Sequence, residues 1–505
     1  EMSQKPSSTY LIVGLIIGLI IGAAIGWAVT PKGVPQEEYD AVVSERDALR
    51  SELDAIRPEY EALKSLVGTL PTDGVITMSA WSAGSPVDYY RAENLKRAAK
   101  LLEALLRGVG LNITIEIDSY YEHVSDWGAW KSKFASAFEA GEAPDIISGI
   151  DMVEAAEAGW IISVDEYYTK YKDLLADIPE YLWDAVKYKG KMWGVPQDVA
   201  SQVFYFRKDV LRQLGWSEEE IEALPDKIAK GEVTWYDLAE VGKEAMEKGL
   251  VQWGFFHRPN WGASLEIPYY LAGGDFYDIE TGKLVLDKSA LKDMFTLFYT
   301  LAQVDKVLPD TMIGTSWREI HMGFVNGRVL FWLGGSWHWG EWQKVEYHET
   351  LGALPESYLW ENVGFALYPA LETGGKAGVT TGPWKYYICS QSKYPELAFL
   401  ICFFATIPPY DTDHALTSSH LPVRYSTLNY PPFVEKGGFL YQVSTFVAKH
   451  GMSKPILHPK WGVLKDMLLE HLVKVEKGAL TPDEAVESLV NAAQAELGED
   501  LIVRE

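Results

Sequence analysis

The order of apolar runs along most of the chain constrains the fold more than any other feature of the sequence. Three short apolar runs, at 75–78, 113–117 and 145–147, predict buried strands. Segments with apolar residues at helical spacing lie between them, at 88–107 and 127–140. Strands that alternate with helices of this length are typical of a parallel sheet with crossover helices. The sequence therefore predicts an α/β fold.

The same alternation begins afresh after an apolar run at 203–206. A further strand is predicted at 384–389, and two helices close the chain at 461–477 and 482–495. Two α/β lobes with several chain crossings between them account for this order better than two separate domains. We expect one domain over 72–505, with lobe 1 at about 72–198 and 373–425 and lobe 2 at about 199–372 and 426–505.

An apolar segment at 10–29 follows a short N-terminal tail, 1–9. About twenty apolar residues in a helix span roughly 30 Å of hydrocarbon, which predicts a retained transmembrane helix. Glycines recur at every fourth position along one face of this helix, namely Gly14, Gly18, Gly22 and Gly26. Glycine at this spacing lets two membrane helices pack closely, so we expect the segment to associate with copies of itself.

A coiled-coil stalk is predicted at 39–70, after a linker at 30–38. Apolar residues recur there in alternating steps of three and four, and the seam includes Leu49, Leu53, Ile56 and Leu63. This period is typical of helices that pair in a coiled coil. We expect a parallel homo-oligomer joined through the span and the stalk. The alternative is a single amphipathic helix that lies back on its own domain.

The composition excludes some classes of partner. A formal net charge of −26 argues against nucleic acid and anionic headgroups, because binding them needs Lys and Arg to replace counterions. The 48% hydrophobic content is ample for a large core. Cys389 and Cys402 are the two cysteines, and two inert buried thiols are favoured over a disulfide.

Catalytic and metal-binding patterns are absent or poor. His348 and Glu349 lack a second histidine four residues on, and the sequence has no Cys-x-x-Cys. The stretch 411–414 carries two aspartates and a histidine, but after two prolines it predicts a polar loop rather than a cation site. We therefore expect neither an enzyme nor a bound metal or cofactor.

Several short motifs resemble one family. In the family's order they are APDII at 143–147, GKMWGVP at 190–196, FRKDVL at 206–211, TWYDL at 234–238, FVNGR at 324–328, GSWHW at 335–339 and LPVR at 421–424. Together they resemble the extracellular solute-binding proteins of ABC importers, in particular the sugar-binding, maltose-binding-like branch and its archaeal membrane-anchored type. Arg207 departs from the Asn that is usual in this family.

The resemblance implies a two-lobed clamp that closes on a solute in the cleft between its lobes and then docks on a membrane permease. Sugars have flat apolar faces edged with hydroxyl groups, so a sugar site needs aromatic platforms and a few polar groups. By family correspondence and position near the chain crossings, the expected platforms are Trp81, Trp337, Trp384 and Trp461.

The expected polar contacts are Asp151, Asp198 and Gln202, since carboxylates accept from two hydroxyls and amides both donate and accept. Helix capping is the alternative for Asp151, and solvation in a loop is the alternative for Asp198. Asn112 begins the N-glycosylation acceptor sequence of the chain.

These patterns together predict a single-pass cell-membrane protein with an extracellular receptor domain, which captures a sugar or oligosaccharide for an ABC importer. The residues leave other functions open. A structural surface-assembly protein could keep the same fold, and the solute could be a peptide. A surface glycosidase would need two carboxylates facing each other across a groove.

Overall fold

A computed structural model describes residue 61 and residues 63–505 of the chain. Within this part no helix is long and apolar enough to span a membrane. The predicted membrane helix at 10–29, with its four glycines, lies outside the described residues. The linker and most of the predicted stalk, including Leu49, Leu53 and Ile56, also lie outside them.

Lobe 1 is built on the parallel strands β1 (Asp73–Gly84), β2 (Asn112–His123) and β3 (Ile146–Ser148). The helix α3 (Tyr90–Gly108) connects the first two strands, and α4 (Trp127–Glu139) follows the second. On α3 the buried residues recur every three or four positions, as a helix that covers one face of a sheet requires. The predicted α/β fold is confirmed for this lobe.

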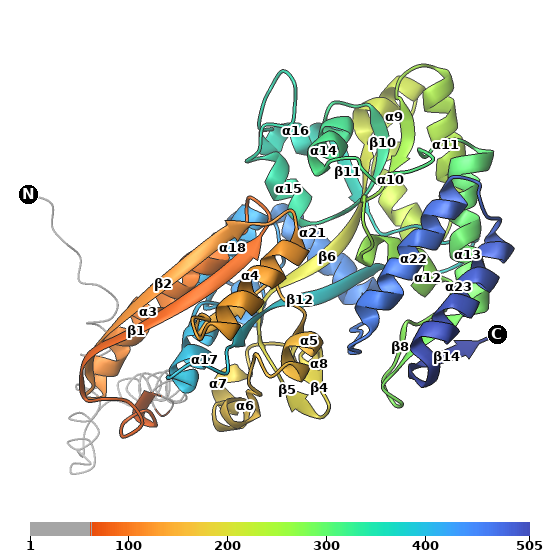
Figure 1. Cartoon of the computed structure of the whole chain (residues 1–505). Coiled ribbons are helices and arrows are strands. Elements are labelled where there is room, and N and C mark those ends of the chain that lie inside the picture. The colour runs from red at the N-terminus through yellow and green to blue at the C-terminus, as the bar shows by residue number, and fades with distance from the viewer. Residues whose placement is uncertain (1–60, 62) are drawn as a thin grey trace, which may run out of the picture.

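Two long strands join the lobes. β6 (Val195–Arg207) pairs with β12 (Val379–Ile388) along its first half and with β10 (Val329–Gly335) and β11 (Val363–Ala366) along its second half. One sheet, in the order β2-β1-β3-β12-β6-β10-β7, therefore runs through both lobes. Figure 1 shows β6 and β12 side by side where the lobes meet.

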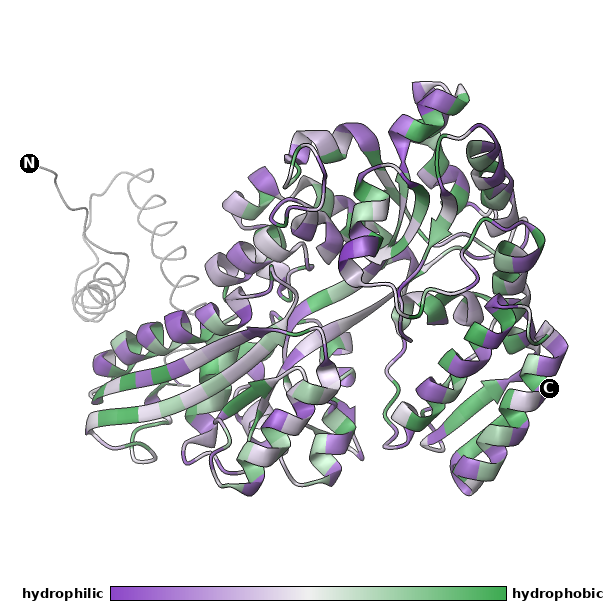
Figure 2. Ribbon diagram, turned by 45° about the horizontal axis from the view of Figure 1, so that its top comes forward, coloured by the Kyte–Doolittle hydropathy of each residue, from purple (hydrophilic) through white to green (hydrophobic). Residues whose placement is uncertain are grey.

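Lobe 2 carries β7 (Trp253–Phe256), which lies parallel to β10, and a separate core of buried residues. Its helices are α9 (Lys208–Leu214), α10 (Glu218–Ala229), α11 (Trp235–Glu247), α12 (Ala263–Leu271), α13 (Lys288–Tyr299), η1 (Thr300–Val304), α14 (Trp317–Val325), α15 (Trp337–Trp342), α16 (Glu356–Asn362), α22 (Trp461–Glu476), α23 (Pro482–Leu497) and η2 (Gly498–Asp500). A small sheet of β14 (Leu501–Arg504), β9 (Lys283–Asp287) and β8 (Tyr277–Asp278) completes the lobe. Figure 2 shows apolar residues gathered along the strands, with hydrophilic residues on the outer faces of the helices.

The remaining short elements surround the sheet on the lobe 1 side and near the crossing. They are α5 (Met152–Glu157), α6 (Asp165–Lys170), α7 (Lys172–Leu175), α8 (Glu180–Asp184), β4 (Lys187–Tyr188), β5 (Lys191–Met192), α17 (Pro395–Phe404), α18 (Pro408–Ser418), α19 (Tyr425–Leu428), α20 (Pro431–Lys436), α21 (Gly438–His450) and β13 (Gly451–Ser453). Phe433 and Phe439 are buried, and the ring of Phe439 stacks on that of Trp339 of α15 with ring centres 4.5 Å apart. Helix α21 therefore packs against α15 near the crossing.

The prediction of a polar loop at 411–414 is wrong, because these residues lie in helix α18. Pro408 occupies the first helical position, where its missing N–H leaves no hydrogen bond unmade, so the two prolines start the helix. The helix buries Asp411 and His414. Those polar side chains form hydrogen bonds inside the protein, with Thr427 and Asp198, instead of facing solvent from a loop.

The end of the predicted stalk packs on its own domain. Leu63 is 4% exposed and Leu66 is fully buried, both within the lobe 1 core, whereas Val67 is 49% exposed. Turns at 65–66 and 68–69 end the helical segment before β1 begins. Leu63 thus lies inside the domain rather than on a seam between chains, because the helical repeat stops one turn after it.

Candidate functional site between the lobes

A pocket of 270 Å³ lies beside the strands that join the lobes. It is lined by residues 150–153 at the start of α5, by residues of β12 from Thr381 to Tyr387, and by the segment 453–457 that follows β13. That segment leads on toward α22 of lobe 2. The walls of the pocket therefore come from lobe 1, from the crossing strand β12 and from the segment that leads into lobe 2. A ligand bound between two lobes needs walls from both sides of this kind.

Asp151 lines this pocket and is exposed. Its Oδ1 accepts a hydrogen bond from the backbone N–H of Glu154 at 2.9 Å, which caps α5. Its Oδ2 accepts no hydrogen bond from the residues that the structure describes. The capping role that the sequence allowed is present, and Asp151 also lines the pocket.

Lys385 also lines the pocket, and its ammonium group has no ion pair or hydrogen bond with a described residue. Lys454, the other lysine of the lining, pairs with Asp275 at 2.8 Å. Burial lowers the pKa of Lys385, and the negative charge of Asp151 opposes that shift. The pocket thus contains one cation whose charge is not matched by a direct partner.

The register of β12 against β6 shifts at this point. Trp384 pairs with Asp198, but Lys385 pairs with Pro196, so Gln197 has no partner in β12. An extra residue of this kind is a β-bulge, which changes the direction of nearby side chains and often lies beside a functional site. A tertiary feature of the sheet, rather than a local motif, therefore directs the side chains of Trp384 and Lys385.

Trp384 lies between an arginine and a second tryptophan. The guanidinium carbon of Arg91 is 4.0 Å from the centre of its ring, and the ring of Trp127 lies 5.6 Å away. The indole N–H of Trp384 has no hydrogen-bond partner in the described part of the chain. Trp127 is 41% exposed at the first turn of α4. This group offers an aromatic surface next to the crossing strands.

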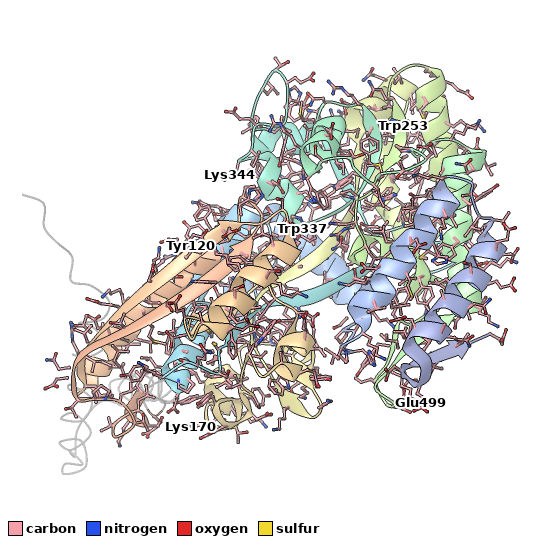
Figure 3. The ribbon with its side chains drawn as sticks, viewed as in Figure 1. Tyr120, Lys170, Trp253, Trp337, Lys344 and Glu499 are labelled. Carbon is pink, nitrogen blue, oxygen red and sulfur yellow. The ribbon has the colours of Figure 1, made fainter. Side chains whose placement is uncertain are left out.

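Trp337 begins α15 and stacks on His420, with ring centres 5.5 Å apart and planes inclined by 24°. Figure 3 places Trp337 where the two lobes meet. His420 follows α18, which packs against α3 of lobe 1, whereas α15 follows β10 of lobe 2. The predicted platform at Trp337 therefore contacts both lobes.

A buried charged network lies beneath these rings. Asp198 is fully buried, and its Oδ2 accepts from Arg91 at 2.9 and 3.0 Å and from Nε2 of His414 at 2.8 Å. Arg91 also contacts Asp88 at 3.1 Å, and Nε2 of His420 lies 3.2 Å from the other oxygen of Asp88. The structure thus places Asp198 below the cleft surface, where it holds the lobe 1 side of the crossing together.

The network sets the charge of its two carboxylates. Burial alone would raise the pKa of Asp198, but the nearby Arg91, His420 and His414 outweigh burial and hold that pKa well below its usual range. Asp88 behaves in the same way, with Arg91 and His420 as the main opposing charges. Both side chains are therefore anionic near neutral pH.

The other predicted contacts are more scattered. Gln202 is buried and pairs with Gly335 where β6 enters lobe 2. The ring of Trp81, on β1, lies 6.1 Å from that of Trp130, and the ring of Trp461 lies 5.4 Å from that of Phe276. Trp461 starts α22, four residues beyond the pocket segment 453–457. These positions surround the crossing without forming a single cluster.

A second cation stands at the edge of lobe 2. β7 and β10 are parallel, so Arg258, which follows β7, and Trp337, which follows β10, come after the same edge of the sheet. Arg258 is half-buried; its Nε donates to Asn260 at 2.9 Å, and it forms no ion pair with a described carboxylate. Burial lowers its pKa, and the more distant Glu266 opposes that shift.

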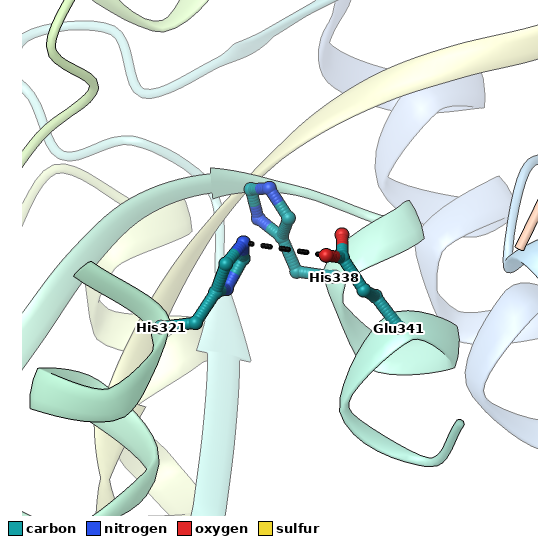
Figure 4. Close-up of side chains that lie close together, drawn as sticks. All are labelled: His321, His338 and Glu341. Carbon is teal, nitrogen blue, oxygen red and sulfur yellow. Dashed lines mark ion pairs between the residues drawn. The ribbon is translucent and has the colours of Figure 1, made fainter. Parts of the chain in front are cut away.

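Three buried side chains come close enough to suggest a metal site: His321, His338 and Glu341, whose ligand atoms lie within 4.8 Å of one another. Figure 4 shows them, with Nε2 of His321 at 3.7 Å from Oε1 of Glu341. Trp342 donates to Nδ1 of His321 at 3.1 Å, and Trp332 donates to Nδ1 of His338 at 2.9 Å.

Those hydrogen bonds fix the chemistry of the two rings. An indole N–H is only a donor, so each Nδ1 is an acceptor and each neutral ring carries its proton on Nε2. The Nε2 lone pairs that a metal ion would need are thus occupied by protons. The backbone N–H of Gly335 also donates to His338 at 3.1 Å. The cluster therefore fixes the turn that presents Trp337.

The structure brings together three of the predicted residues, Asp198, Trp337 and Trp384, through Arg91 and His420. It places Asp151 at the pocket. The sequence prediction missed Lys385, Trp127 and His420, whose side chains reach the crossing from β12, α4 and the loop after α18. Of these three, only Trp127 had a local signal in the sequence, a tryptophan at the start of a predicted helix. The roles of Lys385 and His420 depend on the tertiary arrangement.

A family model for bacterial extracellular solute-binding proteins matches residues 110–403, which is more than half of the chain. The chain belongs to this family. Its members are solute-binding receptors and not enzymes. The resemblance of the short motifs is thereby confirmed at the level of the family.

A curated relative is the arabinooligosaccharide-binding protein of Halalkalibacterium halodurans, which is 24% identical over 261 residues. The match covers 50% of this chain and 52% of that protein, so the chain spans about half the length of the curated relative it matches.

Solved structures share the fold over most of the chain. A solute-binding protein of Thermotoga lettingae, bound with α-D-tagatose, has a TM-score of 0.64 at 20% identity and covers 84% of this chain and 100% of its own. The GacH receptor of Streptomyces glaucescens has a TM-score of 0.65 at 19% identity, with 85% and 99% covered. Maltose-bound MalE3 of T. maritima has a TM-score of 0.63 at 18% identity, and the match covers 83% of this chain and 99% of MalE3. At these identities the likeness is one of fold.

Proposed function

We propose that this protein is a membrane-anchored extracellular receptor that captures a sugar or oligosaccharide between its lobes and delivers it to an ABC importer. The observation that carries the proposal is the pocket beside the crossing strands, together with the rings of Trp384, Trp127 and Trp337, which lie at the same crossing although none of them lines the pocket. Rings of this kind can stack on sugar faces, while Asp151 and Lys385 offer an acceptor and a donor.

The relatives support a carbohydrate ligand. The H. halodurans relative is an arabinooligosaccharide-binding protein, and the structures from T. lettingae and T. maritima hold tagatose and maltose. A receptor of this class closes on its ligand by rotation of the lobes about the crossing strands. In this chain β6 and β12 are the two strands that such a rotation would bend.

Binding can be tested with the full chain in mild detergent. Isothermal titration against neutral arabino-, malto- and cello-oligosaccharides should reveal a ligand, and Trp337→Ala should weaken it on the order of tenfold or more because a stacking surface is lost. Trp253→Ala is the matched control, since Trp253 lies at the amino end of β7, away from the edge that carries Trp337. Equal losses in the two variants, or binding to peptides alone, would reject the assignment.

We also propose that residues 10–29 anchor the chain with Glu1 on the cytoplasmic side, and that the four glycines and the part of the stalk before residue 61 hold copies together in parallel. The mass of the full chain in mild detergent tests this part. A multiple of the chain mass is expected, and replacing Gly14, Gly18, Gly22 and Gly26 by leucine should reduce it. A strictly monomeric mass for the unchanged chain would refute the oligomer.

A further inference from the structure

We propose that the saccharide bound in this cleft is acidic, and that Lys385 binds its carboxylate. The inference rests on the proposed function and narrows it from sugars in general to sugars that carry a carboxyl group, such as oligosaccharides of uronic acids. It depends on the position of Lys385 in the pocket, on what surrounds its ammonium group, and on a second unmatched cation at the edge of lobe 2.

Lys385 is a cation without a counterion inside a strongly acidic protein. The chain has a formal net charge of −26, yet no carboxylate oxygen of the described residues lies within 4.0 Å of this ammonium group. Asp151 is the one acidic residue that lines the same pocket, and its Oδ1 is engaged by the backbone of α5. Lys454, the other lysine of the lining, pairs with Asp275 at 2.8 Å.

Arg258 repeats the pattern in lobe 2. Eight of the described arginines form an ion pair, and the two that do not are Arg258 and Arg318. Arg318 is exposed, where water can solvate the charge, whereas Arg258 is half-buried. Glu266 accepts instead from Trp261 at 3.0 Å and from Tyr270 at 3.3 Å. Arg258 is therefore the half-buried arginine whose charge is left without an ion-pair partner.

A carboxylate satisfies such cations better than a hydroxyl group does. Closing the lobes on a neutral sugar removes water from Lys385 and returns hydrogen bonds to oxygens that carry no negative charge, so the buried ammonium group has no counterion. A carboxylate accepts the same hydrogen bonds and also neutralises the charge, and this attraction is stronger away from water. The pocket also retains Asp151 as an acceptor for hydroxyl groups. Lys385 thus favours one negative charge on an otherwise hydroxyl-rich ligand.

The test compares matched ligands. Trimers of galacturonate, mannuronate and guluronate are titrated into the full chain, each beside the same trimer with its carboxyl groups reduced to alcohols. At least one acidic trimer should bind on the order of tenfold tighter than its reduced form. Lys385→Gln should remove that difference, and Lys393→Gln should keep it. Lys393 is an exposed lysine on the surface, so it controls for the loss of one positive charge.

The outcomes separate the two proposals. If neutral trimers bind and acidic ones bind no tighter, the proposal of an acidic ligand is rejected and the proposed function stands. If Lys385→Gln keeps the full difference, Lys385 is not the residue that binds the carboxylate. If no saccharide binds, both proposals fall. Should Lys385→Gln not fold, Lys385→Met gives the second test: it keeps the length of the side chain and removes its charge, so the preference for the acidic trimer must disappear, and a preference that stays overturns the proposal.

Discussion

The guanidinium group of Arg91, on α3, binds the carboxylate of Asp198, on β6, through two hydrogen bonds of 2.9 and 3.0 Å. Both side chains are at most 2% exposed. The pair joins a helix of lobe 1 to the strand that passes into lobe 2. The ring of Trp384 lies over the same guanidinium. A buried ion pair therefore underlies the aromatic surface at the crossing.

Removing one member of this pair should be costly. Asp198→Ala leaves the charge of Arg91 buried beside Asp88 alone, and breaking a buried pair in this way costs about 3–5 kcal/mol of unfolding free energy. Urea denaturation measures the loss. The matched control is Glu154→Ala, which breaks an exposed pair with Lys131 at 3.0 Å and should cost about 1 kcal/mol or less. A similar small loss in Asp198→Ala would contradict the role given to the pair.

Asp411 makes stability depend on pH near neutrality. Burial raises the pKa of Asp411 to about 7, although Thr427, Arg424 and the backbone of Val423 oppose it. The unfolded carboxyl has a pKa of about 3.9. The folded state therefore holds its proton more tightly, and the stability from this group is complete below about pH 4 and is lost as pH rises through about 7.

The isosteric change Asp411→Asn removes this titration. Thr427 donates to the carboxyl group at 2.7 Å, and the Asn oxygen can accept the same bond. We expect the unfolding free energy of the variant, relative to the unchanged protein, to increase from about pH 4 to about pH 7 and then to level off. Denaturation curves at several pH values measure the difference. A difference that does not change with pH would contradict the assignment to Asp411.

The fold could be predicted from the sequence wherever a residue pattern is compatible with only one kind of secondary structure. The runs at 75–78 and 113–117 lie in β1 and β2, as predicted. A short alternating or continuous apolar run between amphipathic helices is typical of a buried strand. β6 was predicted only at 203–206, because Gln197, Asp198 and Ser201 interrupt its apolar run. These polar residues are buried in the crossing, where Arg91 and His414, distant in sequence, bind one carboxylate oxygen of Asp198.

The site was harder to predict for the same reason. Trp337 followed from its motif, but His420 stacks on it from a segment 83 positions later. Lys385 is a candidate ligand contact because no described carboxylate pairs with its ammonium group. That absence is visible only in the three-dimensional structure. Asp198 was expected on the cleft surface, but Arg91 and His414 draw its carboxylate beneath it.

The end of the stalk gives a third prediction. Leu63→Ala removes a side chain that is 4% exposed in the lobe 1 core, so it should cost about 2–5 kcal/mol of unfolding free energy. Val67→Ala removes one that is 49% exposed and should change stability by about 0.5 kcal/mol or less. Denaturation of the full chain in mild detergent measures both. Equal effects would mean that Leu63 does not belong to the domain core.

Trp127 should contribute to ligand affinity although no motif marks it. Its ring is 41% exposed and lies at 57° to that of Trp384, which leaves one aromatic face open beside the crossing. A stacking contact contributes about 0.5–1.5 kcal/mol, so Trp127→Ala should weaken saccharide binding up to about tenfold. Tyr425→Ala is the matched control, because this aromatic residue is 54% exposed on α19, its backbone N–H bonds to Asp177, and it makes no ring contact with the described tryptophans of the crossing. Unchanged binding by Trp127→Ala would exclude this face from the ligand site.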